Sequence, residues 1–179
     1  MVDIYPPVVT IDGPSASGKG AVSEFLSQKT GFNYLDSGLL YRLFGLEVLS
    51  QGISLSVLAD EWSESKRLVE CLEAKLASRS KETKVGSFGP IFMNGTSDAR
   101  TEHAGAYASK IAQIPLVRRA LLDLQRSFRE HPGLIADGRD MGSVVFPDAL
   151  LKVFLTASPL CRAERRHKQL KDKGIDVSL

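Results

Sequence analysis

A glycine-rich segment near the N-terminus constrains the fold more than any other part of the chain. Residues 13–20 read GPSASGKG, which has the GxxxxGK spacing. A short β-branched run, residues 8–11, precedes it, and apolar residues at helical spacing follow it. In this setting backbone N–H groups turn inward around a polyphosphate, the helix N-terminus adds the positive end of its dipole, and Lys19 adds a full charge. We therefore predict a strand, a nucleotide-phosphate loop and a helix, rather than an ordinary glycine-rich turn.

The residue after the lysine departs from the general pattern of such loops. A serine or threonine usually stands there and ligates Mg²⁺. Here the position is Gly20, followed by Ala21. We therefore assign no residue as a direct metal ligand, and we expect any Mg²⁺ that accompanies ATP to be held largely through water.

Strand-like and helical segments alternate on both sides of this loop. After the helix that starts at Lys19, the pattern predicts a strand at 32–35 and a helix at 39–49. Near the other end it predicts strands at 134–136 and 151–155 and a basic helix from Pro159 to about residue 173. This alternation is typical of an α/β core with a mainly parallel sheet.

The middle of the chain interrupts that rhythm. Residues 56–80 read as helical, and residues 84–88 and 91–93 flank Gly89-Pro90 like a hairpin. Helical patterns return at 102–113 and 116–129. We expect an α+β insertion in the core, between about residue 38 and residue 100.

Composition excludes several classes of protein. The 23 basic and 21 acidic residues leave a net charge of +2, too balanced for a nucleic-acid or membrane-surface protein. No apolar run is long enough to cross a bilayer, and the N-terminus lacks the pattern of a signal peptide. The two cysteines lack metal-ligand spacing and read as free thiols in a reducing compartment. We expect a cytoplasmic monomer without nucleic-acid or membrane partners.

Four runs carry a resemblance to a known family. GPSASGKG is similar to the loop of nucleoside monophosphate kinases, which usually have threonine or serine where this chain has Ala21. YLDSG with the following Tyr41-Arg42, IADGRDMG at 135–142 and VFPDA at 145–149 resemble cytidylate kinases of the long bacterial type, in the same order and spacing. The likeness extends over nearly the whole chain and is loosest at 56–93. The family pattern continues beyond Leu179 with more of a lid, a further Asp/Arg group and a terminal strand and helix.

The resemblance implies a P-loop NTPase fold with a three-layer core and a parallel sheet, an inserted α+β monophosphate-binding domain and a helical lid. On this basis we expect residues 1–37 to form the first part of the core and 38–100 the insertion. Residues 101–156 would form the second part of the core, and 157–179 the start of the lid. The implied activity is transfer of the γ-phosphoryl group of ATP to CMP or dCMP, with Mg²⁺ as cofactor.

The resemblance also implies roles for individual residues. The loop would bind ATP through Gly13, Pro14, Ser15, Ala16, Ser17, Gly18, Lys19, Gly20 and Ala21. The acceptor CMP would contact Asp36, Ser37, Arg42, Arg100, Ser109, Arg118, Asp137, Arg139 and Asp140. Catalysis would depend on Lys19 and on the lid residues Arg165 and Arg166. Ser109 and Arg118 match the base-reading positions, where a hydroxyl and a guanidinium complement the edge of cytosine.

Other interpretations stay open from the sequence. Arg139 and Asp140 could instead form a structural salt bridge, and the basic helix could be only a solvated face. Another P-loop kinase, such as an adenylate or shikimate kinase, would share the loop but not the later runs. A nucleotide-binding module without turnover is a further alternative, suggested by Ala21.

Overall fold

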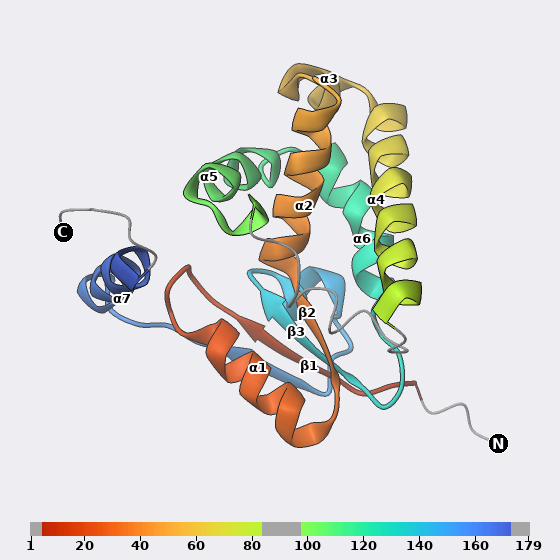
Figure 1. The fold of residues 1–179 in the computed structure, drawn as a ribbon. Coiled ribbons are helices and arrows are strands. Elements are labelled where there is room, and N and C mark those ends of the chain that lie inside the picture. The colour runs from red at the N-terminus through yellow and green to blue at the C-terminus, as the bar shows by residue number, and fades with distance from the viewer. Residues whose placement is uncertain (1–4, 84–97, 173–179) are drawn as a thin grey trace.

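A parallel sheet of four strands lies at the centre of the computed structural model, which describes residues 5–83 and 98–172 (Figure 1). The strands are β1 (Val8–Asp12), β2 (Asn33–Asp36), β3 (Leu134–Gly138) and β4 (Leu151–Phe154), in the spatial order β2-β3-β1-β4. All three pairings are parallel. The α/β fold with a parallel sheet, predicted from the sequence, is therefore confirmed.

The register brings the carboxyl ends of the strands together at one edge of the sheet. Asp36 pairs with Asp137 across β2 and β3, and Asp12 pairs with Gly138 across β1 and β3. The glycine loop leaves this edge after β1. In open α/β sheets ligands bind beyond the carboxyl ends of the strands, so this edge is the expected place for a site.

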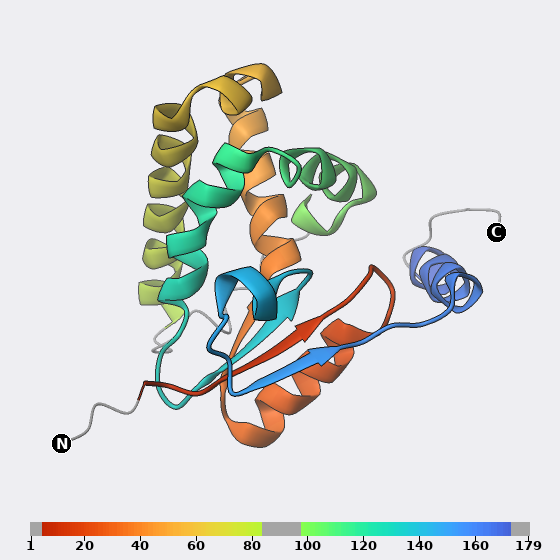
Figure 2. The ribbon, with the colours of Figure 1, turned by 180° about the vertical axis from the view of Figure 1, so that it is seen from behind.

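Helices cover the two faces of the sheet unequally (Figures 1 and 2). Helix α1 (Lys19–Thr30) lies on one face, and a group of helices built around α2 (Ser37–Ser50) lies on the other. That group also contains α3 (Leu55–Asp60), α4 (Trp62–Thr83), α5 (Glu102–Ile111) and α6 (Pro115–Ser127). Helix α5 packs on α2, and α6 packs on α4. Helix α7 (Pro159–Asp172) lies beside the glycine loop.

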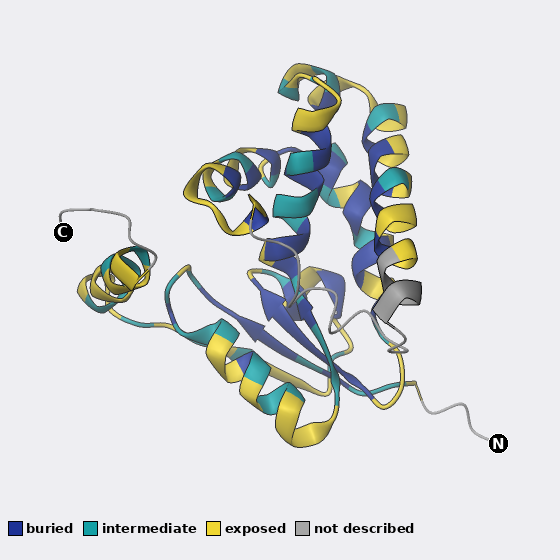
Figure 3. Ribbon diagram, viewed as in Figure 1, coloured by how far each residue is buried: buried dark blue, intermediate teal, exposed yellow. Residues whose placement is uncertain are grey.

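The hydrophobic core lies between the sheet and the α2 group. Leu35 of β2, Leu40 and Phe44 of α2 and Leu121 of α6 are fully buried. Figure 3 shows the buried residues along β1 and β3 and on the inward faces of these helices. Fully burying side chains of this size contributes roughly 1.5–3 kcal/mol each. Helix α2 is therefore anchored to the sheet, and it carries the residues at its N-terminus to the edge where the strands end.

Two details differ from the sequence prediction, and one falls outside the description. Residues 56–80 are helical as predicted except at Glu61, where the chain is extended and the helical stretch divides into α3 and α4. Ser54 caps the first, and the buried hydroxyl of Ser65 donates to the carbonyl of Leu58 near its end. The second difference is a short π-helical turn at Met141–Val145. The hairpin predicted at 84–93 lies outside the described residues.

Within the described ranges, no helix is both long and apolar enough to cross a membrane.

Candidate functional site

The loop between β1 and α1 adopts a backbone conformation that residues with side chains disfavour at several positions. A Cβ at Gly13 would lie 2.0 Å from the carbonyl oxygen of Leu155, so only glycine fits there. Gly18 has φ +98°, and Ala16 is a non-glycine residue with φ +60°, a strained state that clusters at functional sites. No side chain caps the N-terminus of α1 at Gly18, so the amides of its first turn can donate hydrogen bonds to an anion.

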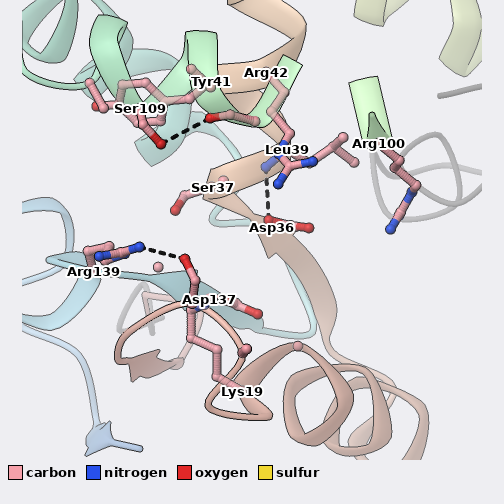
Figure 4. A pocket seen from close by; sticks show the side chains of 18 of the residues that line it. Lys19, Asp36, Ser37, Leu39, Tyr41, Arg42, Arg100, Ser109, Asp137 and Arg139 are labelled. Carbon is pink, nitrogen blue, oxygen red and sulfur yellow. Dashed lines mark hydrogen bonds and ion pairs between the residues drawn. The ribbon is translucent and has the colours of Figure 1, made fainter. Parts of the chain in front are cut away.

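Lys19, in the first turn of α1, faces an acidic residue at the end of β3. Its Nζ lies 3.5 Å from Oδ1 of Asp137, and the side chains are 17% and 6% exposed. Figure 4 shows Lys19 and Asp137 together at the lower wall of the pocket. The hydroxyl of Tyr34 donates to the other carboxylate oxygen, Oδ2, at 3.2 Å. A half-buried cation and a buried carboxylate thus meet beside the phosphate loop.

The opposite wall is built by α2 and the segments that pack on it (Figure 4). Asp36 caps α2 by accepting from the amide of Leu39 at 2.9 Å. Arg42 donates to the carbonyl of Ala99 at 3.1 Å. Its guanidinium lies against α5, where the absent side chain of Gly105 leaves room, because a Cβ there would be 3.1 Å from Nη2. These contacts hold one guanidinium rigidly at the pocket.

Helix α6 contributes a second fixed guanidinium. Arg118 forms an ion pair with Asp140 and donates to the carbonyl of Ala112 at 3.3 Å. Asp140 therefore pairs with Arg118 of α6, and both residues line the pocket. Ser109 donates within α5 to the carbonyl of Gly105 at 2.9 Å. Arg139 instead turns toward the glycine loop and donates to Oγ of Ser15 at 2.7 Å.

Helix α7 reaches both walls through two neighbouring arginines. Arg165 donates to the carbonyl oxygen of Ser17 in the loop at 2.7 Å. Arg166 forms an ion pair with Glu102 at the start of α5. Burial and the nearby Arg42 lower the pKa of Arg166, which marks a concentration of positive charge. Such a concentration suits an anionic ligand.

These walls enclose one pocket of about 890 Å³. The predicted residues that line it are Ser15, Ala16, Lys19, Gly20, Asp36, Ser37, Arg42, Arg100, Ser109, Arg118, Asp137, Arg139, Asp140 and Arg166. The predicted residues that do not line it are Gly13, Pro14, Ser17, Gly18, Ala21 and Arg165. Ala21 is exposed on α1. Gly13, Pro14, Ser17 and Gly18 belong to the loop and shape its backbone. Arg165 contacts the loop from α7.

Comparison with known proteins fits this arrangement. The family model for cytidylate kinase matches residues 9–179. A cytidylate kinase from Pseudomonas putida (strain W619) is 51% identical over 97% of this chain and 74% of its own length. The cytidylate kinase from Nitrosomonas eutropha is 46% identical over 100% of this chain and 75% of its own length. The one from Polynucleobacter necessarius is 49% identical over 97% of this chain and 76% of its own length. The chain belongs to the cytidylate kinase family. The resemblance inferred from the sequence is thereby confirmed.

The pKa of Asp137 in this kinase pocket is shifted well above its ordinary value. Burial raises the pKa of its carboxyl to about 6, and the neighbouring Asp36 raises it as well. Lys19 and the hydrogen bond from Tyr34 act in the opposite direction. Burial prevails, so the carboxylate is less stable here than in water. A strongly perturbed group in a pocket of this kind is typical of a functional site.

Two residues of the site were missed by sequence reasoning. Asp12, at the end of β1, accepts hydrogen bonds from the amides of Met141 and Gly142 at 2.8 and 2.9 Å. It thereby fixes the turn that follows the loop of Arg139 and Asp140. Tyr34 holds Asp137, as described above. Tyr34 begins the YLDSG run and shares a face of β2 with Asp36 by alternation, but neither signal assigned it a role.

Proposed function

We propose that this kinase transfers the γ-phosphoryl group of ATP to CMP or dCMP, giving ADP and CDP or dCDP. One observation carries the proposal: a single pocket joins a phosphate loop and Lys19 on one wall to fixed guanidinium and hydroxyl groups on the other. Its volume suits a small-molecule site. ATP would occupy the loop side, and the acceptor would occupy the side formed by α2, α5 and α6.

Positioning and charge stabilisation account for the chemistry. The acceptor phosphate is already anionic at neutral pH, so its attack on the γ-phosphorus needs no general base. Lys19 and the amides at the start of α1 would hold the β- and γ-phosphates. Arg165 and Arg166 already contact the two walls, and they would neutralise charge that develops on the transferred group.

Recognition of cytosine would fall to Ser109 and Arg118. Cytosine presents an N4 amino donor beside the N3 and O2 acceptors. Asp140 and the carbonyl of Ala112 hold the guanidinium of Arg118 before any ligand binds, which lowers the entropy lost on binding. Arg42 and Arg100 line the same wall and would approach the acceptor phosphate.

The pocket fits a magnesium ion that is held by phosphates and water. The described residues contain no group of three or more His, Cys, Asp or Glu side chains that could hold a metal. Asp36 and Asp137 are register partners at the edge of the sheet, and their carboxylates would hold the water shell of the ion. When bound, Mg²⁺ would neutralise charge on the β- and γ-phosphates.

The test is ADP formation by the purified protein with ATP and Mg²⁺, with CMP, dCMP, UMP, AMP and shikimate offered separately. We expect turnover with CMP and dCMP well above that with AMP or shikimate. Turnover led by AMP or shikimate would favour another acceptor. ATP binding without turnover of any acceptor would favour a binding module, the alternative suggested by Ala21. Action as a monomer, in the cytoplasm and without nucleic acid, remains a prediction from the sequence.

A further inference from the structure

The hydroxyl of Tyr34 lies near Gly20 at the end of the phosphate loop, and the proposed function gives this residue no role. It stands on β2 opposite Ile135 of β3, while Asp36 stands opposite Asp137. Tyr34 is therefore two residues, or about 6.6 Å, short of the level of Asp137 along the strands, on the same face of the sheet. The length of a tyrosine side chain spans this offset, and its hydroxyl reaches Oδ2 of Asp137 at 3.2 Å.

The phenol acts only as a donor in this contact. Burial, followed by the charges of Asp137 and Asp36, raises the pKa of Tyr34 further above its ordinary value. It therefore stays protonated at any pH used for enzyme work, and its proton is directed to the carboxylate. The ionisable groups that face Asp137 are Lys19 from α1 and Tyr34 and Asp36 from β2.

The two oxygens of Asp137 consequently have different partners. Oδ2 is held by Tyr34, and Oδ1 faces the ammonium group of Lys19 at 3.5 Å. A tight charge-assisted hydrogen bond would be shorter, at about 2.7–2.9 Å. Lys19 thus forms a loose ion pair with the carboxylate and not a short hydrogen bond. An ammonium group in this state can move onto a phosphate when a nucleotide arrives.

The residue after the lysine leaves room for this arrangement. A Cβ at Gly20 would lie 3.5 Å from Oδ2 of Asp137 and 3.9 Å from the hydroxyl of Tyr34. The common serine or threonine of the general loop would therefore place its side chain against these two oxygens. In this chain, the space beside Gly20 is taken by the phenol of Tyr34 and the carboxylate of Asp137 instead.

We propose that Tyr34 is a positioning residue for phosphate binding: by holding Oδ2 of Asp137, it keeps Oδ1 close enough to steady Lys19 and too far to withdraw it from the phosphates. This proposal rests on the proposed function, because it requires Lys19 to bind ATP. Without the phenol hydroxyl, the carboxylate turns and closes on Lys19. Nucleotide binding then has to break a tight ion pair.

The test is a double-mutant cycle on ATP affinity, measured by calorimetry with EDTA and no acceptor. We expect Tyr34→Phe to weaken ATP binding about five- to tenfold, the effect of one hydrogen bond to a charged group transmitted in part. The same substitution in an Asp137→Asn background should change affinity less than twofold, because the carboxylate it restrains is gone. Tyr107→Phe, which removes the phenol hydroxyl of a half-buried tyrosine on α5, should leave ATP affinity unchanged.

The outcomes separate the two proposals. If the unmodified protein binds no ATP, the proposed function fails. If it binds ATP and Tyr34→Phe binds equally well, only the role of Tyr34 is overturned. An equal loss in both backgrounds also overturns it, because Tyr34 would then act on general structure and not through Asp137. Thermal unfolding of each variant checks that the compared proteins are folded.

Discussion

At the scale of single residues, the phosphate side of the pocket contains a carboxylate, Asp137, whose charged form is disfavoured by burial. Asp137 is almost fully buried, and its pKa is raised from 3.8 to about 6. An acid with a raised pKa binds more protons in the folded protein than in the unfolded chain between these two values. Stability from this group is therefore greatest below pH 4 and is lost as the pH rises through 6.

Asp137→Asn should accordingly stabilise the protein at pH 7. From the raised pKa we expect this substitution to increase the free energy of unfolding by about 1–3 kcal/mol. Urea denaturation of the two proteins measures the difference. The gain should be smaller at pH 4, where the native carboxyl is already protonated in the fold. Phosphoryl transfer should fall at the same time. A variant less stable than the original at pH 7 would show that the pairing with Lys19 outweighs burial.

Two neighbouring arginines on α6 allow a matched test of acceptor recognition. Arg118 faces the pocket and is oriented by Asp140, whereas Arg119 stacks on the ring of Trp62, 4.9 Å from its centroid. Arg118→Lys should raise KM for CMP about tenfold, because a lysine cannot keep the planar fork. Arg119→Lys should leave KM nearly unchanged. Initial rates against CMP concentration measure both, and equal effects would remove Arg118 from the base-reading site.

At the scale of elements, local patterns predicted most of the fold but not its irregular parts. The glycine loop, α1, α2 and the four strands follow from spacing and periodicity within a few residues. The turn at Met141–Val145 depends on a distant partner, since the amide of Met141 is held by Asp12, 129 residues away. In the same way Tyr34 and Asp137 are 103 residues apart, so the sequence supplied Asp137 without its partner.

The turn after β3 should therefore depend on one carboxylate. The buried carboxylate of Asp12 accepts hydrogen bonds from two backbone N–H groups. Asp12→Asn places the NH₂ group of an amide against one of these two donors. We expect a loss of about 2–3 kcal/mol in the free energy of unfolding. Asp148→Asn is the control, because its pair with Arg129 involves an exposed carboxylate and should contribute less than about 1 kcal/mol. Similar losses in both variants would contradict the role given to Asp12.

At the scale of the whole molecule, α7 is joined to the pocket by a few polar contacts. It has no buried residue, whereas α2 lies in the core. Elements with little apolar burial open locally at low free energy. The helix that carries Arg165 and Arg166 is therefore the part of the site best able to move on binding.

Amide hydrogen exchange should show this difference directly. Without nucleotide, peptides from α7 should exchange much faster than peptides from α2. ATP with CMP should slow exchange in α7, because phosphates become partners for its arginines, and should change α2 much less. An Arg165→Ala variant should lose part of this protection. Slow exchange in α7 before any ligand is added would contradict the expectation.

The strand order also determines when the catalytic pocket can form during synthesis. β1 is made first, but both of its neighbours in the sheet, β3 and β4, come from the far end of the described chain. Until the ribosome has released residues 134–154, the strand that leads into the phosphate loop has no partner, and its apolar side chains stay uncovered. The nascent protein is then most open to chaperones and to aggregation. Capacity to hold a nucleotide should therefore appear late and abruptly during translation.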